Sequence, residues 1–180
     1  MEQVVLYREI QYLRQKLITA LIAISFLLPV IIVAVAYVAE NKSGTPTVQS
    51  IDKQSELVAS LIFTLALGIA VFLLFRYSNL KLEVRTDGFY YKYFPFHLSV
   101  HKILTNDVSK VYIRDFSPLG EYGGWGIRYG FAKRGKGYIV SGKTGLQFEL
   151  KNGKKILFTT TDPRQMEAAV NRIFLHGNKI

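Results

Sequence analysis

The sequence predicts an α+β protein: a two-helix transmembrane hairpin, then a small antiparallel β-barrel or sandwich of about seven strands capped by a C-terminal helix. Three observations predict this fold. Two long uncharged apolar runs occupy residues 17–39 and 57–75. After residue 76, apolar residues recur at every second position, which is the period of a β-strand. From residue 163 the apolar spacing becomes helical.

The two apolar runs are 23 and 19 residues long, and neither contains Asp, Glu, Lys, Arg or His. As helices they would measure about 34 and 28 Å, close to the roughly 30 Å hydrocarbon core of a bilayer. We therefore expect a hairpin over 17–75, with a polar loop over 40–56. A cleaved signal peptide is an alternative for the first run, because residues 34–36 read Ala-Val-Ala, but the run exceeds the usual apolar length of such peptides.

The N-terminal segment, 1–16, shows helical spacing of its apolar residues. Leu6, Ile10 and Leu13 lie four and three residues apart, with polar residues at most positions between them. This pattern predicts an amphipathic helix. Two interpretations stay open, because such a helix either lies along the membrane interface or extends the first span.

Small residues recur at every fourth position of the second run, at Ser60, Thr64 and Gly68. A stripe of this kind lets another helix approach closely, so we expect helix–helix packing there. The first run is the nearest partner. A seam between two copies of the chain is the alternative, which leaves a homo-oligomer open.

Basic residues set the expected orientation. The chain has 18 Lys and Arg against 8 Asp and Glu after Phe75, but 5 of each before it. Basic residues flank both outer ends of the two runs, whereas the loop 40–56 contains only Lys42 and Lys53. Because cytoplasmic flanks carry the excess of Lys and Arg, we expect a multi-pass protein of the cytoplasmic (inner) membrane, with both termini and the basic domain 76–180 in the cytoplasm.

Several short segments after residue 76 alternate between apolar and polar residues, as strands do. Asp87-Gly88 and Asn152-Gly153 supply tight turns between two pairs of them. A loop is expected from Pro118. The predicted strands are 80–85, 89–96, 108–116, 126–131, 136–140, 146–150 and 156–160.

The last predicted element is a helix over 163–176. Asp162 is a good N-cap residue, and Pro163 suits the first helical position. Met166, Val170 and Ile173 then form one apolar stripe, which we expect to close the open end of the β domain.

The order of these elements, the segment 118–128 (Pro-Leu-Gly-Glu-Tyr-Gly-Gly-Trp-Gly-Ile-Arg) and the closing hairpin and helix resemble bacterial pleckstrin-homology-like domains in small proteins with two N-terminal spans. The resemblance covers residues 78–180. It implies a membrane-tethered, non-catalytic binding role. Phosphoinositide-binding pleckstrin domains typically place basic residues around an extended loop between their first two strands. Here that connection is the short turn 86–88, which argues against a headgroup pocket of that kind.

No residue pattern indicates catalysis. Residues 137–144 match the letters of a phosphate-binding loop, but strand-forming residues lie inside the match and a strand pattern follows it, where a helix is required. His97 and His101 lie in an extended segment, not on a helix face that would pair them as metal ligands. The chain has no cysteine, which excludes disulfides and thiolate metal sites. We expect no enzyme activity, no cofactor, no metal and no nucleic acid.

Two groups of residues are candidates for binding. Tyr122, Trp125 and Arg128, in a glycine-rich stretch, would form an exposed aromatic surface for a partner; the alternative is a bulged strand entry with Trp125 packed into the core. A second, basic group would contact lipid or an acidic partner, or would be a solvated face. Its members are Arg76, Lys133, Arg134, Lys136 and Lys143.

The expected function is that of a membrane-anchored, non-catalytic protein-interaction or scaffold module at the cytoplasmic face of the membrane. Because the domain is tethered, it needs no lipid affinity of its own to reach the membrane, and this favours a membrane or cytoplasmic protein partner. The alternative is binding of anionic lipid headgroups by the basic hairpin tips, at about 1 kcal/mol for each well-placed Lys or Arg.

Overall fold

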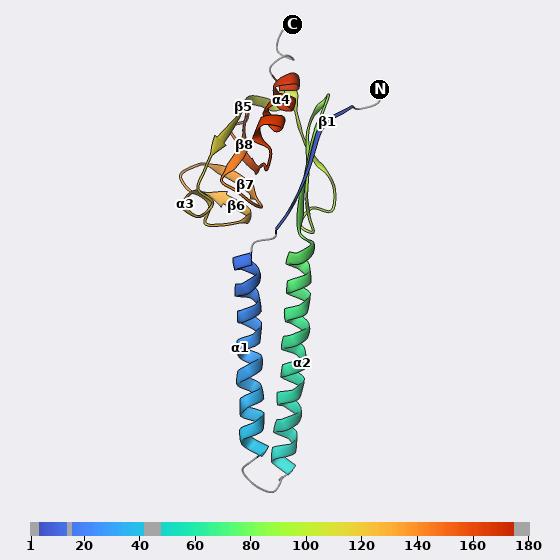
Figure 1. The fold of residues 1–180 in the computed structure, drawn as a ribbon, viewed down its shortest axis with the longest axis vertical. Helices are drawn as coiled ribbons and strands as arrows, with labels where there is room; N and C mark the ends of the chain where they lie inside the picture. Colours follow the sequence, from blue (N-terminus) through green and yellow to red (C-terminus); the bar gives the residue numbers. More distant parts are fainter. Residues whose placement is uncertain (1–3, 14–15, 42–47, 175–180) are drawn as a thin grey trace. The chain divides into compact units, whose positions relative to one another are not determined.

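The computed structural model describes residues 4–13, 16–41 and 48–174, and the chain divides into two compact units. The first, here called the β unit, combines Met1–Leu13 with Tyr77–Ile180. The second, the helical unit, is Arg14–Arg76. Figure 1 shows the elements of both units. The domain predicted over 76–180 therefore lacks a segment that belongs to it, because residues before the apolar runs fold with it.

The helical unit consists of α1 (Lys16–Asn41) and α2 (Val48–Tyr77). Both predicted apolar runs are therefore helical. The predicted loop 40–56 is too long, because residues 48–56 already belong to α2; they contain no Gly or Pro that would stop a helix. The remainder of that loop, 42–47, lies outside the described residues.

By length and composition, one helical segment among the described residues is sufficient to cross a membrane. It is Ser55–Tyr77, with 23 residues and a mean hydropathy of 2.7. Ala23–Ala39 of α1 is also apolar but shorter. The predicted first span begins at 17, and most of its side chains over 17–22 lie outside the description.

The small-residue stripe of α2 contacts α1 at one of its three positions. Gly68 is buried, and a Cβ atom added there would lie 2.9 Å from the ring of Phe26 on α1. Thr64 is half-buried. Ser60 is exposed, and its hydroxyl donates to the carbonyl of Leu57 at 2.8 Å. Gly68 is thus the residue that permits the helices to approach, and a seam between copies stays a prediction.

The β unit contains two sheets. The first is antiparallel, in the order β1-β2-β3-β4 (Figure 1). Its strands are β1 (Val5–Tyr12), β2 (Asn79–Arg85), β3 (Gly88–Phe94) and β4 (His101–Leu104). The tight turn between β2 and β3 confirms the predicted hairpin, and β4 had no counterpart among the predicted strands.

The amphipathic helix predicted over 1–16 is wrong where the structure describes it, since β1 occupies its centre. The strand pairs along its whole length with β2, from Val5 opposite Arg85 to Tyr12 opposite Asn79. Pairing with a neighbouring strand outweighs the weak local preference that helical spacing expresses. Residues 1–3 and 14–15 of that prediction lie outside the described residues.

The second sheet has the order β5-β8-β9-β7-β6. Its strands are β5 (Val108–Asp115), β6 (Gly126–Gly130), β7 (Gly135–Ile139), β8 (Thr144–Leu150) and β9 (Lys155–Thr159). The prediction of a purely antiparallel domain is corrected here, because β7 and β9 are parallel. They become neighbours because β8, which follows β7 in sequence, pairs instead with β5 and β9.

Short helical elements complete the β unit. The predicted loop after Pro118 begins with a short helix, α3 (Pro118–Tyr122), and Ser117 caps it by accepting from Gly120 N at 3.1 Å. A 3₁₀ turn, η1, spans Thr105–Asp107. The terminal helix α4 (Pro163–Phe174) confirms the predicted helix up to Phe174; residues 175 and 176 lie outside the described residues.

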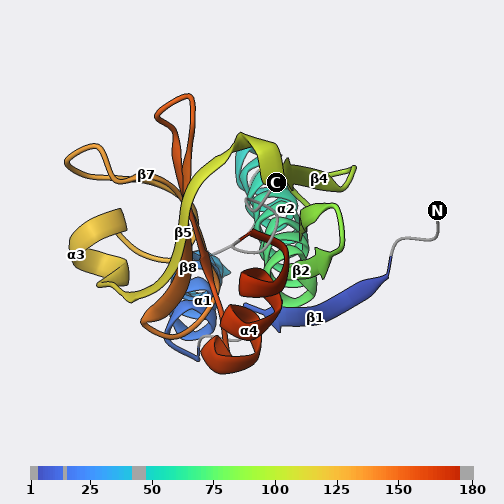
Figure 2. The same cartoon turned by 90° about the horizontal axis from the view of Figure 1, so that it is seen from above.

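The two sheets pack through an aromatic core. The Phe89 ring of β3 lies 4.9 Å from Phe148 of β8 and 5.0 Å from Phe158 of β9. The ring of Tyr91 lies 4.7 Å from Phe158. Helix α4 contacts strands of both sheets and buries its apolar stripe there, including Met166 (Figure 2). These aromatic pairs explain why the alternation of strands after residue 76 is so regular.

The helical unit is inserted into a β-hairpin. β1 and β2 are adjacent antiparallel strands, yet residues 14–76 lie between them in sequence. The backbone N–H of Leu13 donates to the carbonyl of Ser78 at 3.2 Å, so the strand ends meet where an ordinary hairpin would have its turn. Both flanks of the helical unit therefore start from one point of the β unit.

Polar side chains of β1 tie it to the segment between β9 and α4. Glu9 is 7% exposed, and its carboxylate accepts from Thr160 Oγ1 at 2.8 Å, from Thr161 N at 2.7 Å and from Thr161 Oγ1. Gln11 is 3% exposed; it donates to the carbonyl of Thr159 and accepts from its hydroxyl at 2.9 Å. Hydrogen bonding of this kind is what makes a buried polar face tolerable.

Candidate functional site

A basic groove of about 310 Å³ lies on the second sheet and its β6–β7 connection. Four of the seven side chains that line it are cationic, and none of the seven is acidic. They come from three strands and one turn. The lining residues are Tyr112, Arg114, Ala132, Lys133, Arg134, Gln147 and Lys155. We call this site the basic groove.

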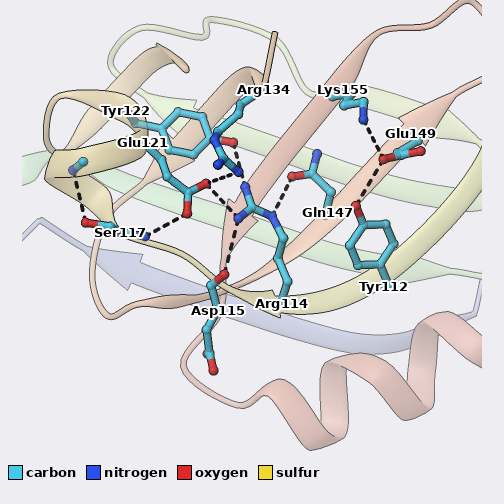
Figure 3. Close-up of polar contacts among 11 residues, drawn as sticks. Tyr112, Arg114, Asp115, Ser117, Glu121, Tyr122, Arg134, Gln147, Glu149 and Lys155 are labelled. Atoms are coloured by element: carbon cyan, nitrogen blue, oxygen red, sulfur yellow. Dashed lines mark hydrogen bonds and ion pairs between the residues drawn. The ribbon is translucent and has the colours of Figure 1, made fainter. Parts of the chain in front are cut away.

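Arg114, on β5, is held in place by four acceptors (Figure 3). Its Nε donates to Gln147 Oε1 at 3.1 Å, and its Nη1 donates to Glu121 Oε2 at 2.8 Å and to the Asp115 carbonyl at 3.3 Å. Its Nη2 donates to the Tyr122 hydroxyl at 3.3 Å. The guanidinium plane is therefore fixed on the floor of the groove, and its charge faces the neighbouring lining residues.

Glu121, on α3, joins two of the groove's cations. Its Oε2 also lies 2.9 Å from Nη1 of Arg134, while Oε1 accepts from the backbone N–H of Ser117 at 3.2 Å. Burial is the largest single influence on the pKa of Glu121 and acts to raise it. The hydrogen bonds from Arg114 and Ser117, with the charges of Arg114 and Arg134, outweigh burial, so the pKa lies below its ordinary value.

Replacing Glu121 by Gln is expected to destabilise the β unit by about 1–2 kcal/mol at neutral pH, because two cations lose a charged acceptor. The folded-state pKa lies below the ordinary value of 4.5, so this stabilisation is present above pH 4.5 and is lost as the pH falls below it. Thermal unfolding in detergent, followed by near-ultraviolet circular dichroism between pH 3 and 7, should show the wild type and Glu121→Gln converging in acid. Glu167→Gln, at an exposed position on α4, is the control. A difference that stays constant through the acid range would contradict the assignment.

A second carboxylate, Glu149, fixes the opposite wall of the groove. Its Oε1 lies 2.9 Å from Nζ of Lys155 and accepts from the hydroxyl of Tyr112 at 3.1 Å. The hydrogen bond from Lys155, then that from Tyr112, lowers the pKa of Glu149, and the same bond raises the pKa of Lys155. The Lys155 ammonium therefore stays charged and in place at neutral pH.

The turn between β6 and β7 carries the remaining lining residues. The N–H of Arg134 donates to the carbonyl of Phe131 at 3.2 Å, and Ala132 and Lys133 have φ angles of 51° and 60°. Both central residues are thus in the left-handed region, the pattern of a type I′ turn, which normally takes Asn or Gly. Residues with side chains pay about 1 kcal/mol or more for this conformation. Such strain is characteristic of functional sites and here holds two cations at the rim of the groove.

Tyr122 packs below the turn. Its ring occupies the space over two glycines, since a Cβ atom at Gly130 or Gly137 would lie 2.8 Å from it. Its ring also meets Phe116 edge-on at 5.8 Å. These contacts form a small core on the outer face of the second sheet. Its buried members are Phe116, Tyr122, Ile139 and Leu157, with Trp125 packed against them.

The structure therefore corrects the predicted aromatic surface at Tyr122 and Trp125. Tyr122 is 2% exposed and cannot present its ring to a partner. Trp125 is half-buried against the small core, which is the alternative given for it. Arg128 is exposed, and its Nε donates to the carbonyl of Trp125 at 2.9 Å, so it braces the loop. The glycines around these residues serve packing and turns.

The predicted basic group is only partly brought together. Lys133 and Arg134 line the groove, whereas Lys136 lies over the ring of Tyr138, 5.0 Å from its centroid. Lys143 is exposed outside the lining, and Arg76 belongs to the helical unit.

Four lining residues were missed by sequence reasoning: Tyr112, Arg114, Gln147 and Lys155. Their signal was weak, because polar residues at alternate positions of a strand look like any solvated face. Only the pairing of β5, β8 and β9 brings them together.

The two histidines lie close together: the rings of His97 and His101 are 4.4 Å apart, and Tyr91 stacks on His101 at 5.4 Å. Among the described residues, no group of three or more His, Cys, Asp or Glu side chains is placed to hold a metal ion. Comparison with protein-family models, curated proteins and solved structures found no match.

Proposed function

We propose that this chain is a membrane-anchored, non-catalytic interaction module whose basic groove binds an acidic segment of a partner protein. The observation that carries the proposal is the groove itself: four cations and no carboxylate among its seven lining residues. The antiparallel first sheet, the second sheet packed on it and the C-terminal helix support the resemblance to pleckstrin-homology-like domains as a further part of the proposal.

The pairing of β1 with β2 supports anchoring by a two-span hairpin. The two strands flank the helical unit in sequence but share one sheet, and a folded sheet lies on one side of a membrane. If α2 crosses at Ser55–Tyr77, the chain must cross an even number of times between Leu13 and Ser78. Within the described residues, α1 is the only other helix in that interval. The basic residues at the flanks favour a cytoplasmic β unit at the cytoplasmic membrane.

The chemistry of the groove favours carboxylate groups of a peptide. Arg134 is the less buried of the two arginines, with a side chain 46% exposed, and a guanidinium fork matches a carboxylate with two parallel hydrogen bonds. Lys133 and Lys155 add point charges on either side, and Tyr112 and Gln147 offer neutral polar groups. Because two acids hold Arg114 and Lys155 beforehand, little ordering remains for binding to supply.

The proposal is tested with the full chain in lipid nanodiscs and a fluorescent glutamate-rich peptide as the probe. Lys133→Gln with Arg134→Gln is expected to weaken binding about tenfold or more, because two charge-assisted contacts are lost. Lys143→Gln with Lys151→Gln removes the same charge at exposed positions outside the groove and serves as the matched control. Equal weakening by both pairs would show diffuse attraction and overturn the assignment of the groove.

A photo-cross-linking residue at Ala132 of the full chain in native membranes identifies the class of partner. The expected adduct is a protein peptide rich in Asp and Glu, lost when Lys133 and Arg134 are replaced. Adducts only with phospholipid would overturn the protein assignment and favour the headgroup alternative. Ala132→Gly relieves the left-handed strain without changing charge, so it controls for the conformation of the turn.

A further inference from the structure

A second surface of the β unit exposes apolar side chains at the end where β2 begins. Leu98, between β3 and β4, is 90% exposed, and four further apolar residues are between 43% and 56% exposed. We call this surface the apolar rim. Its members are Tyr12, Phe94, Phe96, Leu98 and Val100. Exposed apolar residues gathered in one place mark contact sites, whereas scattered ones need no explanation.

The loop that carries most of the rim is held by specific hydrogen bonds. Nζ of Lys92 donates to the carbonyl of Leu98 at 2.9 Å. The backbone N–H of His97 donates to the carbonyl of Tyr93 at 2.8 Å, and Tyr93 N donates back to His97 Nδ1 at 3.3 Å. The ring of Phe96 packs near that of Tyr93, with centroids 5.6 Å apart. The loop therefore holds its apolar side chains outward in a fixed conformation.

Covalent connectivity places the rim beside the end of α2. The candidate span ends at Tyr77, and Asn79 follows two residues later, within about 7.6 Å along the backbone. Asn79 pairs with Tyr12 on one side and with Phe94 on the other. Neighbouring strands lie about 5 Å apart, so both rim aromatics lie close to the point where the span ends. Aromatic residues at that level are typical of a membrane interface.

The charges next to the rim fit anionic lipid headgroups. In the adjacent part of the same sheet, Lys81 of β2 lies directly opposite Lys92 of β3. Like charges in directly opposite positions repel each other, and an anionic group between them would relieve that repulsion. Lysine stems also lie along apolar surface while their ammonium groups reach headgroups. An apolar edge followed by a pair of lysines is the order in which a bilayer presents its own interior and headgroups.

We propose that the apolar rim inserts into the membrane interface beside α2, with Lys81 and Lys92 at anionic headgroups. The inference rests on the anchoring of α2 proposed above, and it is independent of the basic groove. The β unit would then contact the membrane at the rim as well as through its links to α1 and α2. Such a second contact would fix the direction in which the groove faces.

Single cysteines carrying an environment-sensitive fluorophore test this inference, because the chain has no cysteine of its own. The full chain is placed in nanodiscs of phosphatidylcholine and phosphatidylglycerol, with nitroxide groups on a fraction of the lipids. Leu98→Cys reports the rim, and Leu119→Cys reports an exposed leucine on α3 of the same unit. Leu65→Cys, exposed on α2, reports the candidate span.

The expected result is that Leu98→Cys is quenched several-fold more strongly than Leu119→Cys by nitroxides near the headgroups, and Leu65→Cys most strongly by nitroxides deep in the chains. Equal quenching at Leu98 and Leu119 with strong quenching at Leu65 would overturn the rim contact and leave the anchoring in place. No quenching at Leu65 would overturn the anchoring as well. A blue shift at Leu98 without quenching would show protein contact and overturn the lipid assignment.

Discussion

A fragment that begins at residue 76 is expected not to fold, whereas a chain in which an Asn-Gly turn joins Leu13 directly to Ser78 is expected to fold without a membrane. The fragment lacks β1, so β2 loses its neighbour and becomes an unpaired edge. It also lacks Glu9 and Gln11, which pair with the segment between β9 and α4. Since the net stability of a domain is only about 5–15 kcal/mol, the loss of one strand exceeds what remains.

The joined chain restores these contacts with little rebuilding. Leu13 and Ser78 already share a backbone hydrogen bond of 3.2 Å, and the strands they end are in antiparallel register. Asn-Gly is the favoured sequence for a two-residue hairpin turn between such strands. The helical unit is therefore a replaceable connection as far as the fold of the β unit is concerned.

Circular dichroism and thermal melting of the two proteins in aqueous buffer decide the matter. The joined chain should show a cooperative transition and a near-ultraviolet signal from the aromatic core, and the fragment should show neither. A third protein, joined in the same way but with the order of residues 5–12 scrambled, separates the role of β1 from that of mere chain length. A cooperative melt of the 76–180 fragment at the temperature of the joined chain would contradict the role assigned to β1.

The sequence predicted the strands after residue 76 well because their buried faces are apolar. Leu80, Leu82 and Val84 of β2 are fully buried and alternate with polar residues, so a period of two is visible. β1 inverts this pattern. Its buried positions include Glu9 and Gln11, while Ile10 and Tyr12 face outward. Apolar spacing alone therefore indicated a helix, and the hydrogen bonds that make the inverted face stable come from residues about 150 positions away.

The basic groove could be predicted only at its rim. Lys133 and Arg134 are adjacent in a turn and visible as a charge cluster. The floor is different, because Arg114 meets Gln147 and Glu121 only after β5 pairs with β8 and α3 folds beside β6. The parallel pairing of β7 with β9 was equally beyond reach, since no local signal marks a strand that skips its neighbour in sequence.

Glu9→Ala is expected to destabilise the β unit by about 3 kcal/mol, the second largest effect of a change in β1. The carboxylate accepts from the backbone N–H of Thr161 and from the hydroxyls of Tyr7, Thr160 and Thr161. Removing it leaves these donors beside a small void, and a buried donor without an acceptor costs about 1–3 kcal/mol. The backbone N–H of Thr161 has no freedom to turn elsewhere, so its loss is the least avoidable part of the cost.

Two measurements separate this effect from a general weakening of β1. Urea unfolding of the joined chain gives the change in free energy, and hydrogen exchange of the full chain in detergent should show reduced protection at the Thr161 amide. Glu9→Gln keeps the volume and one acceptor oxygen, so it is expected to cost less than Glu9→Ala. Arg8→Ala, which breaks an ion pair with Glu83 from a side chain that is 58% exposed, should cost less than about 1 kcal/mol. If Arg8→Ala were as damaging as Glu9→Ala, the strand as a whole, and not its buried carboxylate, would hold the two ends of the β unit together.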